Sequence, residues 1–155
     1  MTRYRVLIGA DDDVGAWVYS RTPNPQHWTP GTGVAIGFTC AERLVAGVTY
    51  SLYTGANVWT AIASDEHGWL NRRNLALLFD YPFRQLKVRR LSALIDASNT
   101  RSQRFVERLG FTREATLVES APDGDQFVYR MLARDCQWLN VRREREQGRQ
   151  TPGGS

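Results

Sequence analysis

The sequence predicts one α/β domain built on a mixed, largely antiparallel sheet flanked by helices. Residues 34–64 alternate apolar and polar positions in runs that are separated by turn residues, as an antiparallel meander does. After residue 70 the apolar period changes from helix to strand to helix, and a two-strand pattern follows. At 155 residues, the chain has the length of a single domain with a core of its own.

The first third of the chain predicts a strand, a short helix and a long loop. YRVLI is a short apolar run, and VGAWVYSR after the acidic triplet DDD predicts a helix capped by Asp12 or Asp13. Residues 22–33, TPNPQHWTPGTG, are rich in Pro and Gly and too many for a simple connection. We therefore expect this loop to form part of a binding surface around His27 and Trp28.

Three strands are predicted to follow as a meander. The apolar positions alternate in the first two of them, and NVWTAIAS comes after the turn TG as the third. The residues expected on one face are Val34, Ile36 and Phe38 in the first strand and Leu44, Ala46, Val48, Tyr50 and Leu52 in the second.

Helical spacing then begins. Apolar residues at 75, 78, 79 and 86 predict a helix over residues 70–86, and Pro82 should kink or split it because proline lacks the backbone donor. RRLSALID returns to the strand period with Leu91, Ala93 and Ile95. Because a strand, helix and strand in one sheet require a crossover, this strand should lie parallel to the one at 57–64.

The last helix has the clearest predicted ends. Ser98 or Asn99 can cap it, and Gly110 suits the left-handed position after it. One helical face carries Ser102, Phe105, Val106 and Leu109. FTREATLVES and DQFVYRMLAR then predict a hairpin joined by the turn APDGD.

Composition narrows the class of protein. Apolar residues make up 42% of the chain, as in folded proteins, and the net charge is +4. The segment 140–155 carries four arginines against two glutamates, which is half of that excess, and its polarity predicts a basic, disordered tail after a domain at 1–139. With no long apolar stretch and no signal-peptide pattern near the start, we expect a cytoplasmic protein without a membrane segment.

The stretch DEHGWLNRRN, residues 65–74, joins an apolar strand to an apolar helix and raises the question of its role. A metal site is not predicted, because three adjacent loop residues rarely converge on one ion and neither Cys40 nor Cys136 has zinc-ligand spacing. Hydrolase, kinase and dehydrogenase motifs do not occur in the sequence. A phosphate-binding loop, a nucleic-acid patch and a solvated loop stay open.

The passage RRLSALIDASNTRSQRFVERLGFTREATL resembles the C-terminal half of the GCN5-related N-acetyltransferase (GNAT) family. The matching residues are Asn99, Ser102, Phe105, Glu107, Leu109, Gly110, Phe111, Glu114 and Ala115. The chain is most similar to the small acetyltransferase-like proteins of phages and prophages. This resemblance implies a GNAT-like fold with a splayed central parallel strand pair, and transfer of an acetyl group from acetyl-CoA to a primary amine by direct attack in a ternary complex.

The resemblance also implies the site. The pantetheine arm of the cofactor would lie between the strands at 57–64 and 91–96, and its pyrophosphate would lie on the amides that open the next helix. The expected cofactor-binding residues are Ile62, Ala63, Gly68, Trp69, Arg72, Arg73, Asn99, Ser102 and Phe105. The phosphate loop of the family has more glycines than this chain, in which Arg72 and Arg73 offer a replacement.

The catalytic residues are expected at two places. Asp65 or Glu66 would accept the proton of the amine. Many members carry a tyrosine where this chain has Val106, so the acid would be Ser102, Tyr129 or a water molecule, or the thiolate would need none.

The sequence leaves several alternatives open. The main one is a nucleic-acid-associated protein, either a phage-type nucleobase-modifying acyltransferase or a non-catalytic binding module, since arginine is abundant. The acceptor amine could belong to a polyamine, a protein terminus or lysine, an antibiotic or a nucleobase. The oligomeric state is not predicted, and a homodimer stays open.

Overall fold

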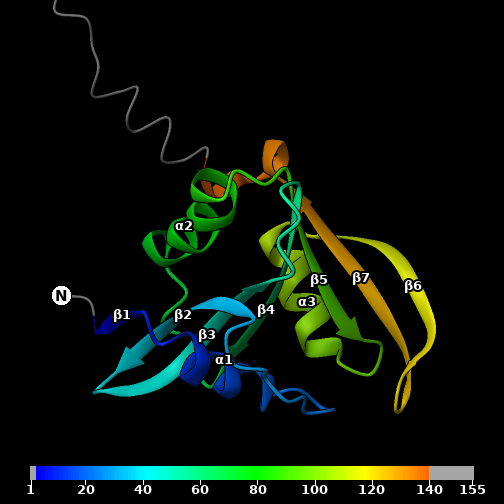
Figure 1. The fold of residues 1–155 in the computed structure, drawn as a ribbon, viewed down its shortest axis with the longest axis horizontal. Helices are drawn as coiled ribbons and strands as arrows, with labels where there is room; N and C mark the ends of the chain where they lie inside the picture. Colours follow the sequence, from blue (N-terminus) through cyan, green and yellow to red (C-terminus); the bar gives the residue numbers. More distant parts are fainter. Residues whose placement is uncertain (1–2, 140–155) are drawn as a thin grey trace, which may run out of the picture.

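The computed structural model describes residues 3–139, which form one seven-stranded sheet with helices on both faces (Figure 1). The predicted tail at 140–155 lies outside the described residues. The elements in chain order are β1 (Tyr4–Ile8), α1 (Asp11–Tyr19), β2 (Gly33–Cys40), β3 (Arg43–Ser51), β4 (Asn57–Ser64), α2 (Arg72–Asp80), the π-helix η1 (Tyr81–Gln85), β5 (Arg90–Asp96), α3 (Thr100–Leu109), β6 (Thr112–Ala121), β7 (Gly124–Leu132) and the 3₁₀-helix η2 (Ala133–Asp135).

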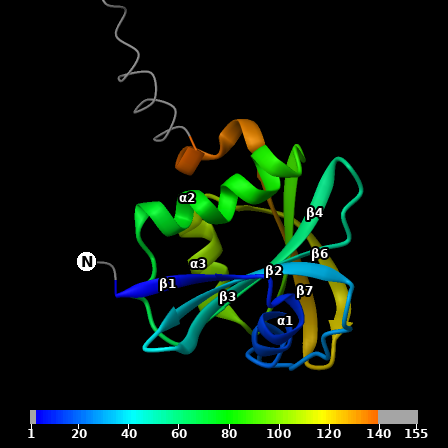
Figure 2. The ribbon, with the colours of Figure 1, turned by 60° about the vertical axis from the view of Figure 1, so that its left-hand side comes forward.

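The sheet has the strand order β1-β2-β3-β4-β5-β7-β6, and only β4 and β5 pair in parallel. Figure 2 shows α1 on one side of the sheet and α2 and α3 on the other. The larger core lies on the side of α2 and α3, and a smaller one around Val14, Val18 and Ala35 lies under α1. The predicted mixed α/β class is confirmed.

The predicted meander is confirmed as β2, β3 and β4, with two corrections in β3. A β-bulge between Phe38 and Thr39 shifts the pairing by one residue, so Leu44 packs beneath α1 rather than with Ala46. Leu52 lies beyond the end of β3 and is 70% exposed. Because the side-chain period of a strand is two, a one-residue bulge moves every side chain beyond it to the other face.

The acidic start of α1 is a second correction. The helix begins at Asp11, so Asp12 and Asp13 lie in its first turn and do not cap it. Asp12 instead accepts hydrogen bonds from the Trp28 indole (2.9 Å) and the Gly31 amide (3.0 Å), which lower the pKa of its carboxyl. These bonds fasten the long loop after α1 onto the helix.

The helix predicted over 70–86 starts two residues later and changes type at Tyr81, one residue before Pro82. The α2 segment has Asn71 as its cap, with Asn71 Oδ1 accepting from the Asn74 amide at 2.9 Å. From Tyr81 the backbone continues as the π-helix η1, in which proline occupies the first turn. The missing donor of Pro82 is thus accommodated by wider turns, as the predicted kink required.

The last helix and hairpin form as predicted. Asn99 caps α3 by accepting from the Ser102 amide (3.2 Å), and Gly110 takes a left-handed conformation with φ of 111°. The hairpin of β6 and β7 follows, with every residue of β6 before Ala121 exposed.

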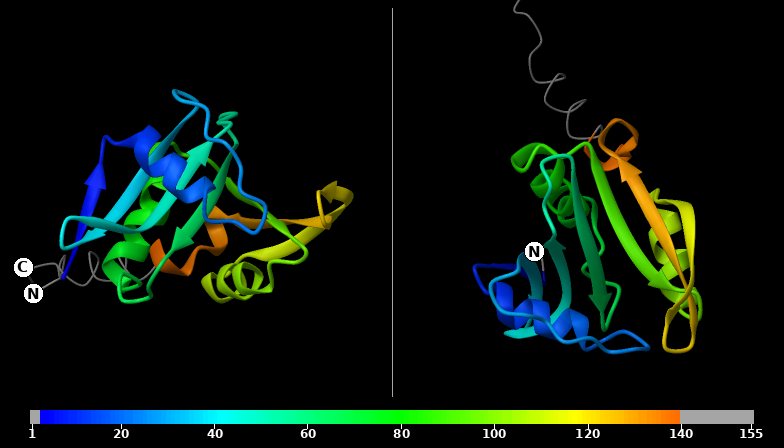
Figure 3. Two further views of the ribbon diagram at one scale, coloured as in Figure 1. Left: turned by 90° about the horizontal axis from the view of Figure 1, so that it is seen from below. Right: turned by 45° about the vertical axis from the view of Figure 1, so that its right-hand side comes forward.

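Strands β4 and β5 diverge after a short parallel ladder. Residues 57–59 pair with residues 90–92, and no pairing follows between the later residues of these two strands. Figure 3 shows the two strands starting together and separating toward their C-terminal ends. The backbone edges of β4 and β5 therefore face each other across a gap, as expected.

Between residues 3 and 139 there is no helix long and apolar enough to cross a membrane.

Candidate functional site

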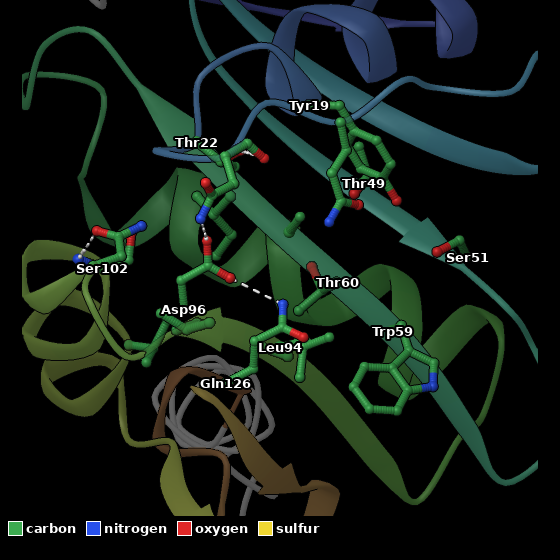
Figure 4. Close-up of a pocket in the computed structure, with 18 of the residues that line it drawn as sticks. Tyr19, Thr22, Thr49, Ser51, Trp59, Thr60, Leu94, Asp96, Ser102 and Gln126 are labelled. Atoms are coloured by element: carbon green, nitrogen blue, oxygen red, sulfur yellow. Dashed lines mark hydrogen bonds between the residues drawn. The ribbon is translucent and has the colours of Figure 1, made fainter. Parts of the chain in front are cut away.

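A cavity of about 520 Å³ lies where β4 and β5 separate (Figure 4). Its lining comes from the strands on both sides of the gap, from the loop after α1, and from α3, β6 and β7. The lining residues are Tyr19, Thr22, Asn24, Gln26, Thr49, Ser51, Leu52, Trp59, Thr60, Ala61, Ile62, Ala93, Leu94, Ile95, Asp96, Asn99, Ser102, Phe105, Val106, Leu117 and Gln126.

The cavity has one side on each face of the sheet. Ala61 packs with the core under α1, so Trp59 on the same strand and Leu94 and Asp96 on β5 share that face by alternation. Ile62 and Ala93 belong to the core under α2 and α3. The gap between the strands therefore connects an α1 side with a helix side.

The long loop contributes to the α1 side, but not through the residues expected. Thr22, Asn24 and Gln26 line the cavity. Trp28 is 4% exposed and packs against Tyr19 at a centroid distance of 5.0 Å, and neither it nor His27 is part of the lining. The loop lines the cavity while its tryptophan is buried, and the predicted role of the loop in binding stays a prediction.

Among the described residues, Asp96 is the one charged residue in the lining, and the sequence reasoning missed it. Its Oδ2 accepts from Asn24 Nδ2 at 2.7 Å, and its Oδ1 accepts from Gln126 Nε2 at 2.9 Å (Figure 4). Asn24 Nδ2 also donates to Asp123 at 2.9 Å. These bonds hold the carboxylate in place and tie the loop to the end of β5 and to the hairpin.

Two threonines in the lining carry hydroxyls without partners. Thr49 is 1% exposed and Thr60 is 6% exposed, and within residues 3–139 neither Oγ1 has a hydrogen-bond partner. Buried hydroxyls without a partner cost free energy, so they are uncommon in folded proteins. Both threonines thus border the cavity with a hydroxyl whose hydrogen-bonding capacity is unused.

Four of the predicted cofactor-binding residues line the cavity. They are Ile62 of β4 and Asn99, Ser102 and Phe105 at the start of α3. Val106 lies beside them, 5% exposed, where many family members carry a tyrosine. The strand edge and α3 thus come together as the resemblance implied, and their contact with a cofactor stays a prediction.

Asp65 and Glu66 lie outside this lining. Asp65 forms an ion pair with Arg21 at 3.0 Å, and that guanidinium stacks on Trp17 at 3.6 Å. Glu66 hydrogen-bonds Tyr4 of β1 and thereby raises the pKa of that tyrosine. Neither the Asp65 carboxylate nor the Glu66 carboxylate therefore lies in the cavity that would receive an amine.

Gly68 and Trp69 are explained by packing. A Cβ atom on Gly68 would clash with the side chain of Tyr4, so a larger residue would displace that tyrosine whether or not a phosphate binds. The Trp69 side chain is fully buried and lies 4.8 Å from the Phe38 ring, where it cannot contact a ligand. Ala63 packs beneath α1 and is not part of the cavity lining.

Arg72 and Arg73 lie in the first turn of α2 and are exposed. The first backbone amides of a helix have no partner within the helix. Of these amides, the Asn71 side chain accepts a hydrogen bond only from the backbone amide of Asn74. The amides of Arg72 and Arg73 therefore remain for a ligand or for water. Their role in phosphate binding stays a prediction.

Tyr129 is not placed to act as an acid in the cavity. Its hydroxyl donates to Glu107 (2.8 Å) and accepts from Arg113, and its ring is fully buried away from the lining. Burial raises the pKa of this phenol. Of the side chains proposed as the acid, Ser102 is the one that lines the cavity.

The fold and this site together define an α/β acyltransferase architecture, with a cavity between two splayed parallel strands. The acetyltransferase (GNAT) domain family matches residues 12–112, about two thirds of the chain, and the chain belongs to this family of N-acetyltransferases. No curated protein matches the sequence.

Solved structures of acetyltransferases share the fold. A spermidine N-acetyltransferase SpeG chimera from Vibrio cholerae and hSSAT is 15% identical, with a TM-score of 0.67 over 90% of this chain and 100% of that one. A ribosomal-protein-S5-alanine acetyltransferase from Vibrio fischeri is 14% identical, with a TM-score of 0.67 over 88% and 97%. A putative acetyltransferase is 22% identical, with a TM-score of 0.65 over 97% and 95%.

Proposed function

We propose that the protein transfers an acetyl group from acetyl-CoA to a primary amine by direct attack in a ternary complex. The observation that carries this proposal is the cavity between β4 and β5, whose lining comes from both faces of the sheet. One molecule can occupy the helix side and another the α1 side, and the two meet in the gap. A ternary complex requires this arrangement.

The residues on the helix side fit a pantetheine arm. The edges of β4 after Trp59 and of β5 after Ser92 carry backbone groups that the parallel ladder does not use. The two amides of a pantetheine arm can hydrogen-bond such an edge as a further strand does. Phe105 supplies an apolar contact beside it, and Thr60 supplies an unpartnered hydroxyl.

Acetyl-CoA supplies the acetyl group as a thioester: the amine nitrogen bonds to the carbonyl carbon, the carbon–sulfur bond breaks, and the amine proton balances the leaving thiolate. The amine has to lose a proton before it attacks in the gap, and the chain has to shield the thioester from water. The long loop, fastened by Asn24 across the end of β5, provides part of that shield.

A transfer assay tests this function. The full chain is incubated with acetyl-CoA and a set of primary amines, and thiol release and the mass of the product are followed. We expect thiol release that depends on the amine, intersecting initial-rate lines and no acetylated protein when the amine is left out. Parallel lines together with an acetylated protein would instead establish a covalent intermediate and contradict direct attack. Acetyl-CoA binding without transfer to any amine would contradict the enzyme function.

A further inference from the structure

We propose that the acceptor is a singly charged primary amine carried on an aromatic or aliphatic body, and that Asp96 receives its ammonium group. This inference rests on the proposed function, because it assigns the acceptor of the same transfer. Three observations on the α1 side of the cavity carry it: an uncompensated carboxylate, an unpartnered hydroxyl and an apolar mouth.

The carboxylate of Asp96 keeps its capacity to bind a cation. Its two oxygens accept one hydrogen bond each from Asn24 and Gln126, whose amides are neutral. A carboxylate has about four lone-pair positions, so two remain. In the described part of the chain no lysine, arginine or histidine forms an ion pair with Asp96. A half-buried negative charge of this kind is stabilised by an ammonium group.

The hydroxyl of Thr49 is an independent sign of a ligand on the same side. Thr49 and Ser51 face α1 together with Gly47, at which an added Cβ would meet Val18. Thr49 is 1% exposed, and its Oγ1 has no partner within residues 3–139. A ligand N–H or O–H in the cavity would satisfy this hydroxyl.

The mouth of the cavity is apolar and aromatic. Leu94 is 41% exposed and Leu117 is 41% exposed, and both belong to the lining together with Tyr19 and Trp59. Exposed apolar residues around a concave site indicate a ligand with apolar surface. The faces of the two aromatic rings also attract an ammonium group.

A polyamine fits this lining less well. Its additional ammonium groups would need partners, and Asp96 is the one carboxylate that the cavity offers. Asp123 lies nearby, since Asn24 Nδ2 donates to both carboxylates, but it is exposed and outside the lining. Each unpaired ammonium group would either lose its hydration shell without a compensating partner or remain in solvent outside the cavity.

The first test measures selectivity by binding. Tryptamine and spermidine are titrated into the full chain by calorimetry in the presence of CoA, and the same amines are compared as acceptors by kcat/KM. We expect tryptamine to bind at least about tenfold more tightly than spermidine, because two of the three ammonium groups of spermidine would lack a partner. Spermidine binding as tightly as tryptamine, or more so, would overturn the inference even when acetyl transfer occurs. Failure to bind acetyl-CoA would instead count against the proposed function.

The second test uses variants with matched controls. Asp96→Asn should weaken tryptamine binding about tenfold and leave CoA binding unchanged, because it removes the charge that faces the amine. Asp123→Asn loosens the same loop anchor without touching the lining, so its tryptamine affinity should stay near that of the wild type. Equal losses in both variants would show that the loop and not the charge matters, and would overturn the role of Asp96.

A third test replaces an exposed apolar residue at the mouth of the cavity and compares it with an equally exposed residue elsewhere on the sheet. Leu94→Asn should reduce tryptamine affinity several-fold, because Leu94 lines the cavity mouth. Val6→Asn is the control, since Val6 on β1 is also 41% exposed and lies outside the cavity. Tryptamine affinity unchanged in Leu94→Asn would contradict an apolar acceptor site, and this result does not depend on the folding of the Asp96 variant.

Discussion

At the scale of single residues, Asn99 both caps a helix and lines the cavity. Its Oδ1 accepts from the Ser102 amide and so caps α3, while the residue also lines the cavity. The cap uses the oxygen alone, and we propose that the Nδ2 group donates to the cofactor.

Substitutions that keep or remove the cap separate these two uses. Asn99→Ala should lower the free energy of unfolding by about 1 kcal/mol. Asn99→Ser should keep a free energy of unfolding close to that of the wild type, because serine caps nearly as well as asparagine. Both variants lack the Nδ2 donor and should bind acetyl-CoA several-fold more weakly. Urea unfolding and calorimetry provide the two readouts. Wild-type acetyl-CoA affinity in Asn99→Ser would mean that Asn99 is a cap and nothing more.

The carboxylates show where sequence reasoning succeeds and where it does not. Asp65 and Glu66 follow a strand and were expected at the site, yet they contact Arg21 and Tyr4. Asp96 also ends a strand, but its position in the cavity depends on Asn24 and Gln126, which are far away along the chain. The strand period gives the face of Asp96, whereas its partners come from tertiary packing.

At the scale of secondary-structure elements, one hydrogen bond joins the meander to α2. The Tyr50 hydroxyl on β3 donates to the Leu78 carbonyl at 2.6 Å, and the Tyr50 and Tyr81 rings pack 4.9 Å apart. Burial raises the pKa of Tyr50 well above its usual value of 10.0. The bond therefore stabilises the fold only while this phenol keeps its proton.

Tyr50→Phe should lower the free energy of unfolding by about 1 kcal/mol at neutral pH. The folded-state pKa is raised, so the contribution of Tyr50 is complete below pH of about 10 and is lost as the pH rises above it. The stability difference between wild type and variant should therefore shrink in alkaline solution. Urea unfolding at neutral pH and above pH of about 10 measures this, and a difference that grows with pH would contradict the buried position of Tyr50.

The start of α2 carries the prediction about the cofactor phosphates. Replacing both Arg72 and Arg73 by alanine should weaken CoA binding more than about tenfold, because charge-assisted hydrogen bonds are lost. The Asn71 cap stays intact, so the helix should keep its stability. Equal losses for CoA and dephospho-CoA would assign the arginines to the pyrophosphate.

A charge-matched variant supplies the control for this experiment. Replacing Arg89 and Arg134 by alanine removes the same charge from two exposed positions outside the cavity. Its CoA affinity should stay near that of the wild type. A similar loss in both double variants would mean that net charge, rather than the start of α2, governs the affinity.

Element types were predictable because their patterns are local. The change of period at residue 70, the cap at Asn99 and the glycine at Gly110 each depend on residues close in sequence. The bulge at Phe38 and Thr39 and the start of α1 at Asp11 were not predictable from the sequence, because both depend on contacts between elements. The packing around Gly68 was not predictable either, since the neighbouring side chain is Tyr4 of β1, which is far away in the sequence.

At the scale of the whole molecule, the cavity follows from the divergence of two strands. The parallel pair was predictable from the crossover, and the splay was expected from the family resemblance. The sequence does not predict that Asn24 hydrogen-bonds both Asp96 and Asp123. These bonds hold the loop after α1 at one side of the cavity. The hydrogen bonds that hold this side of the cavity together are therefore visible in the structure alone.

The central claim is that the cofactor lies in the gap between β4 and β5, and calorimetry with acetyl-CoA tests it most directly. Ser102→Phe places a bulky ring at the cavity lining, and Arg108→Phe places the same ring on an exposed position of α3 outside it. We expect wild type and Arg108→Phe to bind acetyl-CoA alike and Ser102→Phe to lose at least about tenfold in affinity, since the ring would overlap the cofactor arm. Undiminished binding by a folded Ser102→Phe, or no binding by the wild type, would contradict the claim.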